Sequence, residues 1–113
     1  MTRAVGSILA EILEAIELLH HYTEGLTYAD FASNVEKQDA VLRRLEIIGE
    51  AVKNTAAETR AKYPEIDWRR IAGLRDIIVH QYFGIDDELL WTIISTNVDD
   101  LEQTVRRMLE LEA

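Results

Sequence analysis

Apolar residues recur every three or four positions along most of the chain, which is the spacing of an amphipathic helix. The first stripe predicts a helix over residues 3–23 and consists of Ile8, Ile12, Ile16 and Leu19. Gly25 follows it as a common helix stop, and Thr27 can cap a short turn. The second stripe predicts a long helix from about Asn34 and consists of Val41, Leu45, Ile48 and Val52.

The helical pattern continues beyond the second helix. Residues 56–63 continue that helix or form a separate short one, and Pro64 ends them. Asp67 can cap a further helix over residues 68–82, which Gly84 ends. Its core-facing residues are expected to be Ile71, Leu74 and Ile78.

The last helix is capped by Asp86 or Asp87 and continues to the C-terminus. Its stripe consists of Leu90, Ile94, Val98, Leu101, Val105 and Met108. Strand patterns of useful length are absent from the sequence. We therefore predict an all-α fold, an antiparallel four-helix bundle with one or two additional short helices, in a single domain over residues 1–113.

Composition limits the possible chemistry and location. The sequence has no cysteine, which excludes disulfide frameworks, thiol nucleophiles and cysteine zinc sites. The apolar stretch 8–19 is interrupted by Glu11, Glu14 and Glu17, so it reads as an amphipathic helix rather than a signal peptide or membrane span. We expect a soluble, cytoplasmic protein with no membrane partner.

The charge is unevenly distributed. A net charge of −9 argues against a broad nucleic-acid-binding surface. Residues 60–82 nevertheless carry five basic and three acidic residues, whereas the segments on both sides are acidic. Such a distribution repels long nucleic acid but admits a phosphate at one place.

The basic segment also contains the group of polar residues that most suggests a chemical function. These are Arg75, Asp76, His80 and Tyr82. A buried helix does not need these residues for packing. Nor does it need Gly73, which costs about 1 kcal/mol relative to alanine in a helix interior. We expect another backbone to approach Gly73 closely.

Helical geometry decides which of these side chains can act together. Arg75 and Tyr82 share a face, and so do Asp76 and His80, so Asp76 can orient the imidazole. Arg75 and His80 lie about 140° apart around a straight helix. Either the helix departs from ideal geometry, or a second copy completes the site across a two-fold interface. We favour the homodimer.

This group of residues suits metal-independent RNA cleavage. An imidazole with an ordinary pKa of about 6.5 exchanges protons at neutral pH. An arginine stabilises the charge that develops on a phosphate. No metal site is predicted, because the neighbours His20 and His21 point about 100° apart and are expected to be solvated or capping residues.

Two stretches of the sequence resemble one protein family. The string R-D-x-x-x-H-x-Y, together with the preceding residues 64–75, looks like the HepT-like ribonuclease toxins of the HEPN superfamily. Residues 38–51 are similar to the second helix of the same family. The likeness covers nearly the whole chain.

The resemblance implies a type II toxin whose R-x4–6-H motif is Arg75 and His80, with Asp76 as the supporting polar residue. It also implies a homodimer, or a higher even-numbered oligomer, with two motifs at a shared cleft and no cofactor. Relatives pair with a MntA-like nucleotidyltransferase antitoxin, which transfers AMP to the tyrosine two residues after the histidine. That tyrosine is Tyr82 here.

Other interpretations remain open at this stage. Arg69 and Arg70 could contact RNA or be ordinary surface charges. Trp68 and Trp91 are expected to be core or interface anchors. Instead of a ribonuclease, the chain could be a non-catalytic helical module that binds nucleotide or substrate for a nucleotidyltransferase, or a purely structural dimer.

Overall fold

A computed structural model describes residues 5–74 and 87–112 of the chain. The described residues form helices only, and the predicted all-α class is confirmed. They are α1 (Val5–Thr23), α2 (Tyr28–Ala32), α3 (Val35–Lys53), α4 (Ala57–Lys62), α5 (Trp68–Ala72), α7 (Asp87–Thr92), the π-helical η1 (Ile93–Asn97) and α8 (Val98–Glu112). None of these helices is long and apolar enough to cross a membrane.

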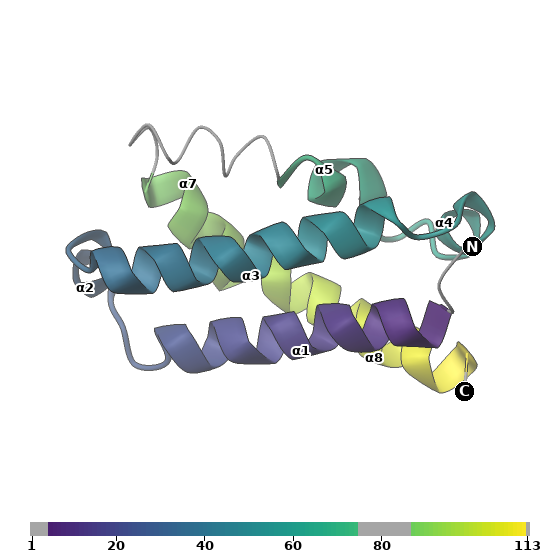
Figure 1. Ribbon diagram of the computed structural model, residues 1–113, viewed down its shortest axis with the longest axis horizontal. Helices are drawn as coiled ribbons and strands as arrows, with labels where there is room; N and C mark the ends of the chain where they lie inside the picture. The colour runs from purple at the N-terminus through teal and green to yellow at the C-terminus, as the bar shows by residue number, and fades with distance from the viewer. Residues whose placement is uncertain (1–4, 75–86, 113) are drawn as a thin grey trace.

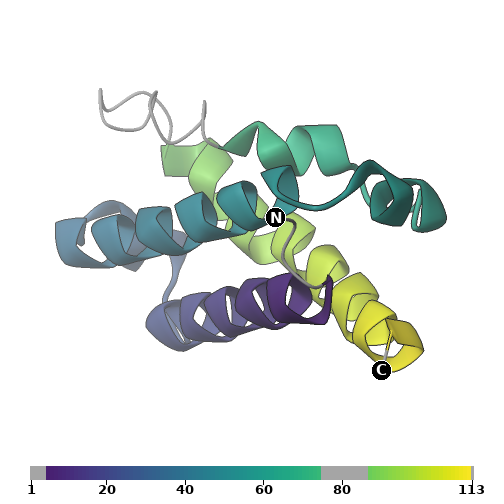
Figure 2. The same ribbon diagram turned by 45° about the vertical axis from the view of Figure 1, so that its right-hand side comes forward.

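The bundle is built on the pair α1 and α3, which lie side by side and run in opposite directions (Figure 1). The short helix α2 lies in the connection between them. Helix α8 packs on α1, and α5 packs on α3. A second view shows that α7, η1 and α8 follow one another along a single long path across the pair (Figure 2).

The predicted stripes form the core. All four stripe residues of α1 and all four of α3 are buried. The stripe of the last helix is buried along its whole length as well, from Leu90 to Met108. These residues belong to one hydrophobic cluster that also includes Phe31 and Trp68. Burial of apolar surface therefore holds α1, α3 and α8 together.

Local side-chain caps set the helix starts. Thr27 and Asp30 form a capping box, in which the backbone N–H of Thr27 donates to Oδ2 of Asp30 at 3.0 Å and the backbone N–H of Asp30 donates to Oγ1 of Thr27 at 3.2 Å. Hydrogen bonds from the backbone and from the side chain of Thr27 lower the pKa of the Asp30 carboxyl, and the backbone bond has the larger effect. Asn34 caps α3 by accepting from the backbone N–H of Lys37 at 3.0 Å. Helix α3 ends at its C-cap Asn54. Of the two alternatives predicted after it, a continuation or a separate short helix, the structure shows the separate helix, over residues 57–62.

The last helix contains one turn that the sequence did not predict. The backbone N–H of Val98 donates to the carbonyl of Ile93, five residues earlier, which is the hydrogen bond of a π-helix. Leu90 and Val98 are eight residues apart, whereas two α-helical turns take about seven. The wider π turn takes up the extra residue, so both side chains face the core.

We predict that Ile48→Ala lowers the free energy of unfolding by about 2–5 kcal/mol, because Ile48 is fully buried in α3 and truncation leaves a cavity. Urea unfolding at one fixed protein concentration measures the change. The neighbouring variant Ile47→Ala removes a half-buried side chain and should cost clearly less. Equal losses for the two variants would contradict this assignment of the core.

Candidate active site

The short helix α5 leads directly into the motif segment, and polar contacts fix its first turn. Asp67 caps it, as predicted, by accepting from the backbone N–H of Arg70 at 3.0 Å. The ring of Trp68 is buried, and its indole Nε1 donates to the carbonyls of Tyr63 at 3.0 Å and Arg60 at 3.1 Å. Trp68 therefore ties α5 to the end of α4, and its predicted role as a core anchor is confirmed.

Arg60 in turn ties α4 to the end of α3. Its Nη2 donates to the carbonyls of Val52 and Lys53, both at 2.9 Å, and its Nε donates to the carbonyl of Thr55 at 3.1 Å. Carbonyls at a helix C-terminus lack intrahelical partners and attract a cation. Sequence reasoning missed this contact, because it depends on how the chain folds back after α3.

Helices α3 and α5 meet at Gly49, not at Gly73 as expected. A Cβ atom on Gly49 would lie 3.6 Å from the carbonyl oxygen of Ile71 and 3.7 Å from the Cβ of Leu74. Helix α5 lies so close to α3 here that only a small residue fits at position 49. The atoms nearest to Gly73 among the described residues belong to the turn just before it, so they give no support to the predicted approach of another backbone to Gly73.

Gly73 instead ends α5. Its backbone N–H donates to the carbonyls of Arg69 and Ile71, and α5 stops at Ala72. The helix predicted over residues 68–82 is therefore interrupted early, consistent with the low helix propensity of glycine. Leu74 is helical again and buried.

The predicted catalytic residues Arg75 and His80, the supporting Asp76 and the AMP acceptor Tyr82 lie outside the described residues. So does Ile78, which was expected to face the core. Arg75 follows Leu74 directly in the chain, so the described contacts fix the place at which the motif segment begins.

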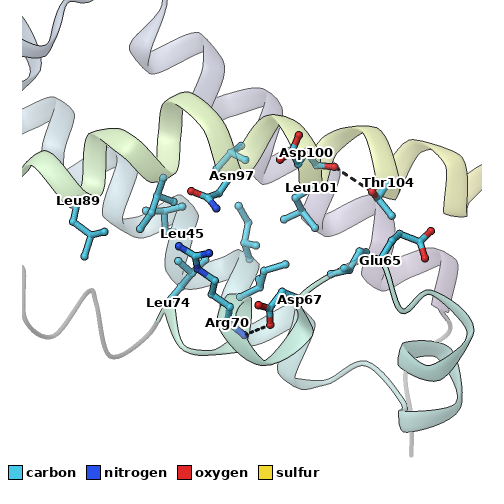
Figure 3. Close-up of a pocket in the computed structure, with 15 residues that line it drawn as sticks. Leu45, Glu65, Asp67, Arg70, Leu74, Leu89, Asn97, Asp100, Leu101 and Thr104 are labelled. Carbon is cyan, nitrogen blue, oxygen red and sulfur yellow. Dashed lines mark hydrogen bonds between the residues drawn. The ribbon is translucent and has the colours of Figure 1, made fainter.

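A cavity of about 210 Å³ lies beside this place, between α5 and the path of η1 and α8 (Figure 3). Its apolar wall comes mainly from Leu45, Ile48, Ile71, Leu74, Ile93 and Leu101. The cavity is small for a drug-sized ligand, and its size suits a compact planar group or an inserted side chain.

Charged side chains surround the cavity unevenly. Glu65, Asp67 and Asp100 line it together with Arg70, which is the sole cation among its described lining residues. The Arg70 side chain extends from α5 toward Asn97 on the facing helix (Figure 3). Such a rim repels a bare phosphate unless further basic residues contribute. The two arginines considered for RNA contact are both exposed, but they differ because Arg70 lines the cavity and Arg69 does not.

An ion pair holds the loop before α5 against α8. Glu65 in this loop pairs with Arg107 on α8. Together with the Trp68 and Arg60 hydrogen bonds, this contact gives α5 fixed attachments to both α3 and α8. The start of the motif segment is therefore set by the bundle and not by a free loop.

Two further residues from the sequence analysis have clear positions. Trp91 packs its ring against Phe31 and Tyr28, with centroids 5.3 Å and 6.3 Å apart, which confirms an anchor at the core boundary. His20 was expected to be solvated or capping; its side chain is indeed partly exposed, but its Nε2 also lies 2.9 Å from Oε1 of Glu102 on α8, a contact that the sequence did not predict. These residues are 82 positions apart, so only the fold reveals the contact.

Comparison with known proteins gives one matching family model, described as Ribonuclease HepT-like, over residues 12–108. No solved structure matches the chain significantly. The match extends from α1 to near the end of α8 and spans the motif segment. The resemblance stated from the sequence is thereby confirmed.

Curated relatives agree with this match. The "Probable ribonuclease HepT" of Thermococcus cleftensis is 40% identical over 90% of this chain and 93% of its own length. The "Putative RNase TTE0752" of Caldanaerobacter subterraneus subsp. tengcongensis is 38% identical over 92% and 93%. The "Gamma-glutamylcyclotransferase and putative RNase MJ0434" of Methanocaldococcus jannaschii is 42% identical over 97% of this chain, which spans about half of that relative's length.

We predict that Gly49→Ala and Gly49→Leu act in opposite directions. An alanine Cβ meets its neighbours at ordinary contact distances and improves helix propensity, so stability should stay level or rise by up to about 1 kcal/mol. A leucine side chain would overlap α5 and should cost about 1–3 kcal/mol. Denaturant unfolding of both variants checks this, and equal tolerance of alanine and leucine would refute the close contact between α3 and α5.

Proposed function

Because this chain belongs to the HepT-like ribonuclease family, we propose that it is an endoribonuclease toxin that cleaves RNA with Arg75 and His80. The family match over residues 12–108 carries the proposal, since it covers both residues and the helices that lead to them. Membership fixes the class of enzyme. The residue roles, the partner and the regulation belong to the proposal.

The proposed reaction uses the RNA's own 2′-hydroxyl as nucleophile. His80 accepts the proton of this hydroxyl as the 2′-oxygen bonds to phosphorus. The bond from phosphorus to the 5′-oxygen breaks, and the leaving oxygen takes up a proton from imidazolium or water. The products are a 2′,3′-cyclic phosphate and a 5′-hydroxyl. Arg75 stabilises the negative charge on the phosphate oxygens in the transition state, and Asp76 orients the imidazole. No step requires a metal ion.

The described neighbourhood supports this assignment in two ways. First, the contacts of Trp68 and Gly49, with that of Glu65 in the preceding loop, attach α5 to α4, α3 and α8, so the described chain leads to the motif from a defined position at Leu74. Catalysis needs such positioning, because small displacements of a catalytic group are costly. Second, Arg70 offers one cation beside the cavity, which together with the arginine of the motif would contact an RNA phosphate against the acidic rim.

We further propose that two copies form the active unit. On a straight helix Arg75 and His80 would point to different sides, about 140° apart. A second copy related by a two-fold axis would then supply the histidine that faces the arginine of the first copy, and the reverse. In this arrangement two motifs line one cleft.

Regulation is proposed to act on Tyr82. A nucleotidyltransferase antitoxin of the MntA-like kind would transfer AMP to its hydroxyl in the cytoplasm, where toxin, antitoxin and RNA meet. On an ideal helix, residues seven apart such as Arg75 and Tyr82 share a face, so the added nucleotide would bring bulk and negative charge next to the arginine. The modified tyrosine would thereby exclude RNA.

We predict that expression of the wild-type chain arrests growth, and that Arg75→Ala and His80→Ala each abolish the arrest. RNA cleavage by the purified variants should fall at least about 100-fold, because each variant removes a group that acts in the transition state. The assay is cleavage of total RNA in EDTA. Arg43→Ala and His21→Ala, which exchange the same residue types at exposed positions, should remain active.

The same experiment separates the ribonuclease from the non-catalytic binding module. Circular dichroism shows whether each variant is folded, and mass spectrometry shows whether Tyr82 is free of AMP. A folded, unmodified wild-type chain that neither arrests growth nor cuts RNA would overturn the ribonuclease and favour the binding module. If the wild type has no activity and exchanging Arg75 or His80 changes only the stability, a purely structural dimer would be favoured.

Tyr82→Phe gives a separate prediction about regulation. The variant keeps the ring but lacks the hydroxyl that accepts AMP. It should cleave RNA at close to the wild-type rate and remain toxic when the antitoxin is co-expressed, whereas the wild type should be silenced. Growth curves of the two strains, with mass spectrometry of the recovered toxin, make the comparison. Silencing of both toxins without modification would contradict the role of Tyr82.

A further inference from the structure

The contact between α1 and α8 brings three potential metal ligands together from opposite ends of the chain. Nε2 of His20 lies 2.9 Å from Oε1 of Glu102 and 3.4 Å from Oδ1 of Asp99. All three atoms lie within 4.8 Å of one another. His20 comes from the last turn of α1, and the two carboxylates come from the first part of α8.

We propose that His20, Asp99 and Glu102 form a binding site for a divalent transition-metal ion, with Zn²⁺ as the preferred ion. The site is independent of the proposed ribonuclease function. It lies where α1 meets α8, whereas the cavity beside α5 is lined by other residues of α8, such as Asp100, Leu101 and Thr104. The bound ion would join the two helices.

The distances fit the ion. Zn²⁺ binds imidazole nitrogen and carboxylate oxygen at about 2.0–2.2 Å, so two ligand atoms of a tetrahedral site lie about 3.3 Å apart. The separations of 2.9 Å and 3.4 Å lie on both sides of that value. Small side-chain rotations would therefore suffice for binding. One nitrogen and two oxygen ligands favour zinc over Mg²⁺, which prefers oxygen ligands only.

The backbone around the three ligands is firmly held. Asp99 and Glu102 are three residues apart, so they lie on one face of α8. The adjacent residues Val98 and Leu101 are buried in the core, as is Leu19 next to His20. The side chains of His20 and Asp99 remain 37% and 54% exposed, so an ion can reach them from solvent. A water molecule can supply the fourth ligand.

The local charge favours a cation. A shallow groove next to the site is lined by Glu17, His20, His21, Glu24 and Asp99, among others. Arg106 is the nearby basic residue, and it donates to Oε2 of Glu102 from Nε at 3.1 Å and from Nη2 at 2.9 Å. Its Nη2 also lies 3.3 Å from Oε1 of Glu17. Arg106 therefore binds Oε2 of Glu102, whereas His20 faces Oε1.

The pKa of the Glu102 carboxyl is set by opposing influences. Burial raises the pKa of its carboxyl, but the hydrogen bonds and charges of Arg106 and His20 together outweigh burial, so the pKa lies below its ordinary value. A carboxylate must be deprotonated to bind a metal. The main competing explanation is an ion pair between protonated His20 and the two carboxylates, which needs no metal.

The experiment uses the purified full chain after treatment with EDTA and removal of the chelator. Calorimetric titration with ZnCl₂ should show one Zn²⁺ bound per chain, and saturating zinc should raise the thermal unfolding midpoint by several degrees. MgCl₂ at the same concentration should do neither. His20→Ala should lose the zinc response, whereas His21→Ala, the adjacent matched control, should retain it.

Two more variants keep the test decisive if His20→Ala disturbs folding. Asp99→Asn changes one exposed ligand atom and should weaken zinc binding at least about tenfold. Arg106→Gln removes the competing cation and should tighten zinc binding several-fold, while a plain ion pair predicts no zinc binding in any variant.

Zinc binding should weaken as the pH falls, because protons compete for the ligands. No zinc binding by the wild type, or equal binding by wild type and His20→Ala, would overturn the proposal. Neither result bears on RNA cleavage in EDTA, which tests the ribonuclease separately.

Discussion

The contact between α1 and α3 buries two apolar stripes against each other, and the other described helices take their positions from this pair. Each fully buried aliphatic side chain contributes about 1.5–3 kcal/mol by leaving water. The stripes are continuous over several turns, so the pair is a long, straight support. Helix α8 can then pack across α1, and the short helix α5 can pack on α3, although five residues do not form a stable helix alone.

The parts of the fold that depend on neighbouring residues in the sequence were predictable. The stripe of α3 and its cap Asn34, and the box of Thr27 and Asp30, all act over three or four positions. The contacts that depend on tertiary structure were not. Gly73 seemed the place of close approach, yet Gly49 is, because only the folded chain brings Ile71 over α3. For the candidate site, the sequence supplies the residue types of the motif, whereas the cavity and the attachments of α5 come from the fold.

The attachments that lead to α5 share one physical feature, which is that a side chain donates to backbone carbonyls at the end of the preceding helix. Arg60 does this at the end of α3, and Trp68 does it at the end of α4. Such bonds are directional, and burial around the indole makes their loss costly. They hold a short helix in one orientation, which apolar packing alone would define less sharply. A segment meant to present reactive groups benefits from that support.

The π turn at Ile93–Asn97 has a consequence for how the length of this chain can vary. Within an α-helix, the insertion or deletion of one residue rotates everything beyond it by about 100° and removes the buried stripe from the core. Here the surplus residue is already confined to one wide turn. A relative that lacks one residue in this turn could close it into ordinary α-helix and keep Leu90 and the whole of α8 on their present faces. This turn is thus the point in the last helix where evolution can change length without changing register.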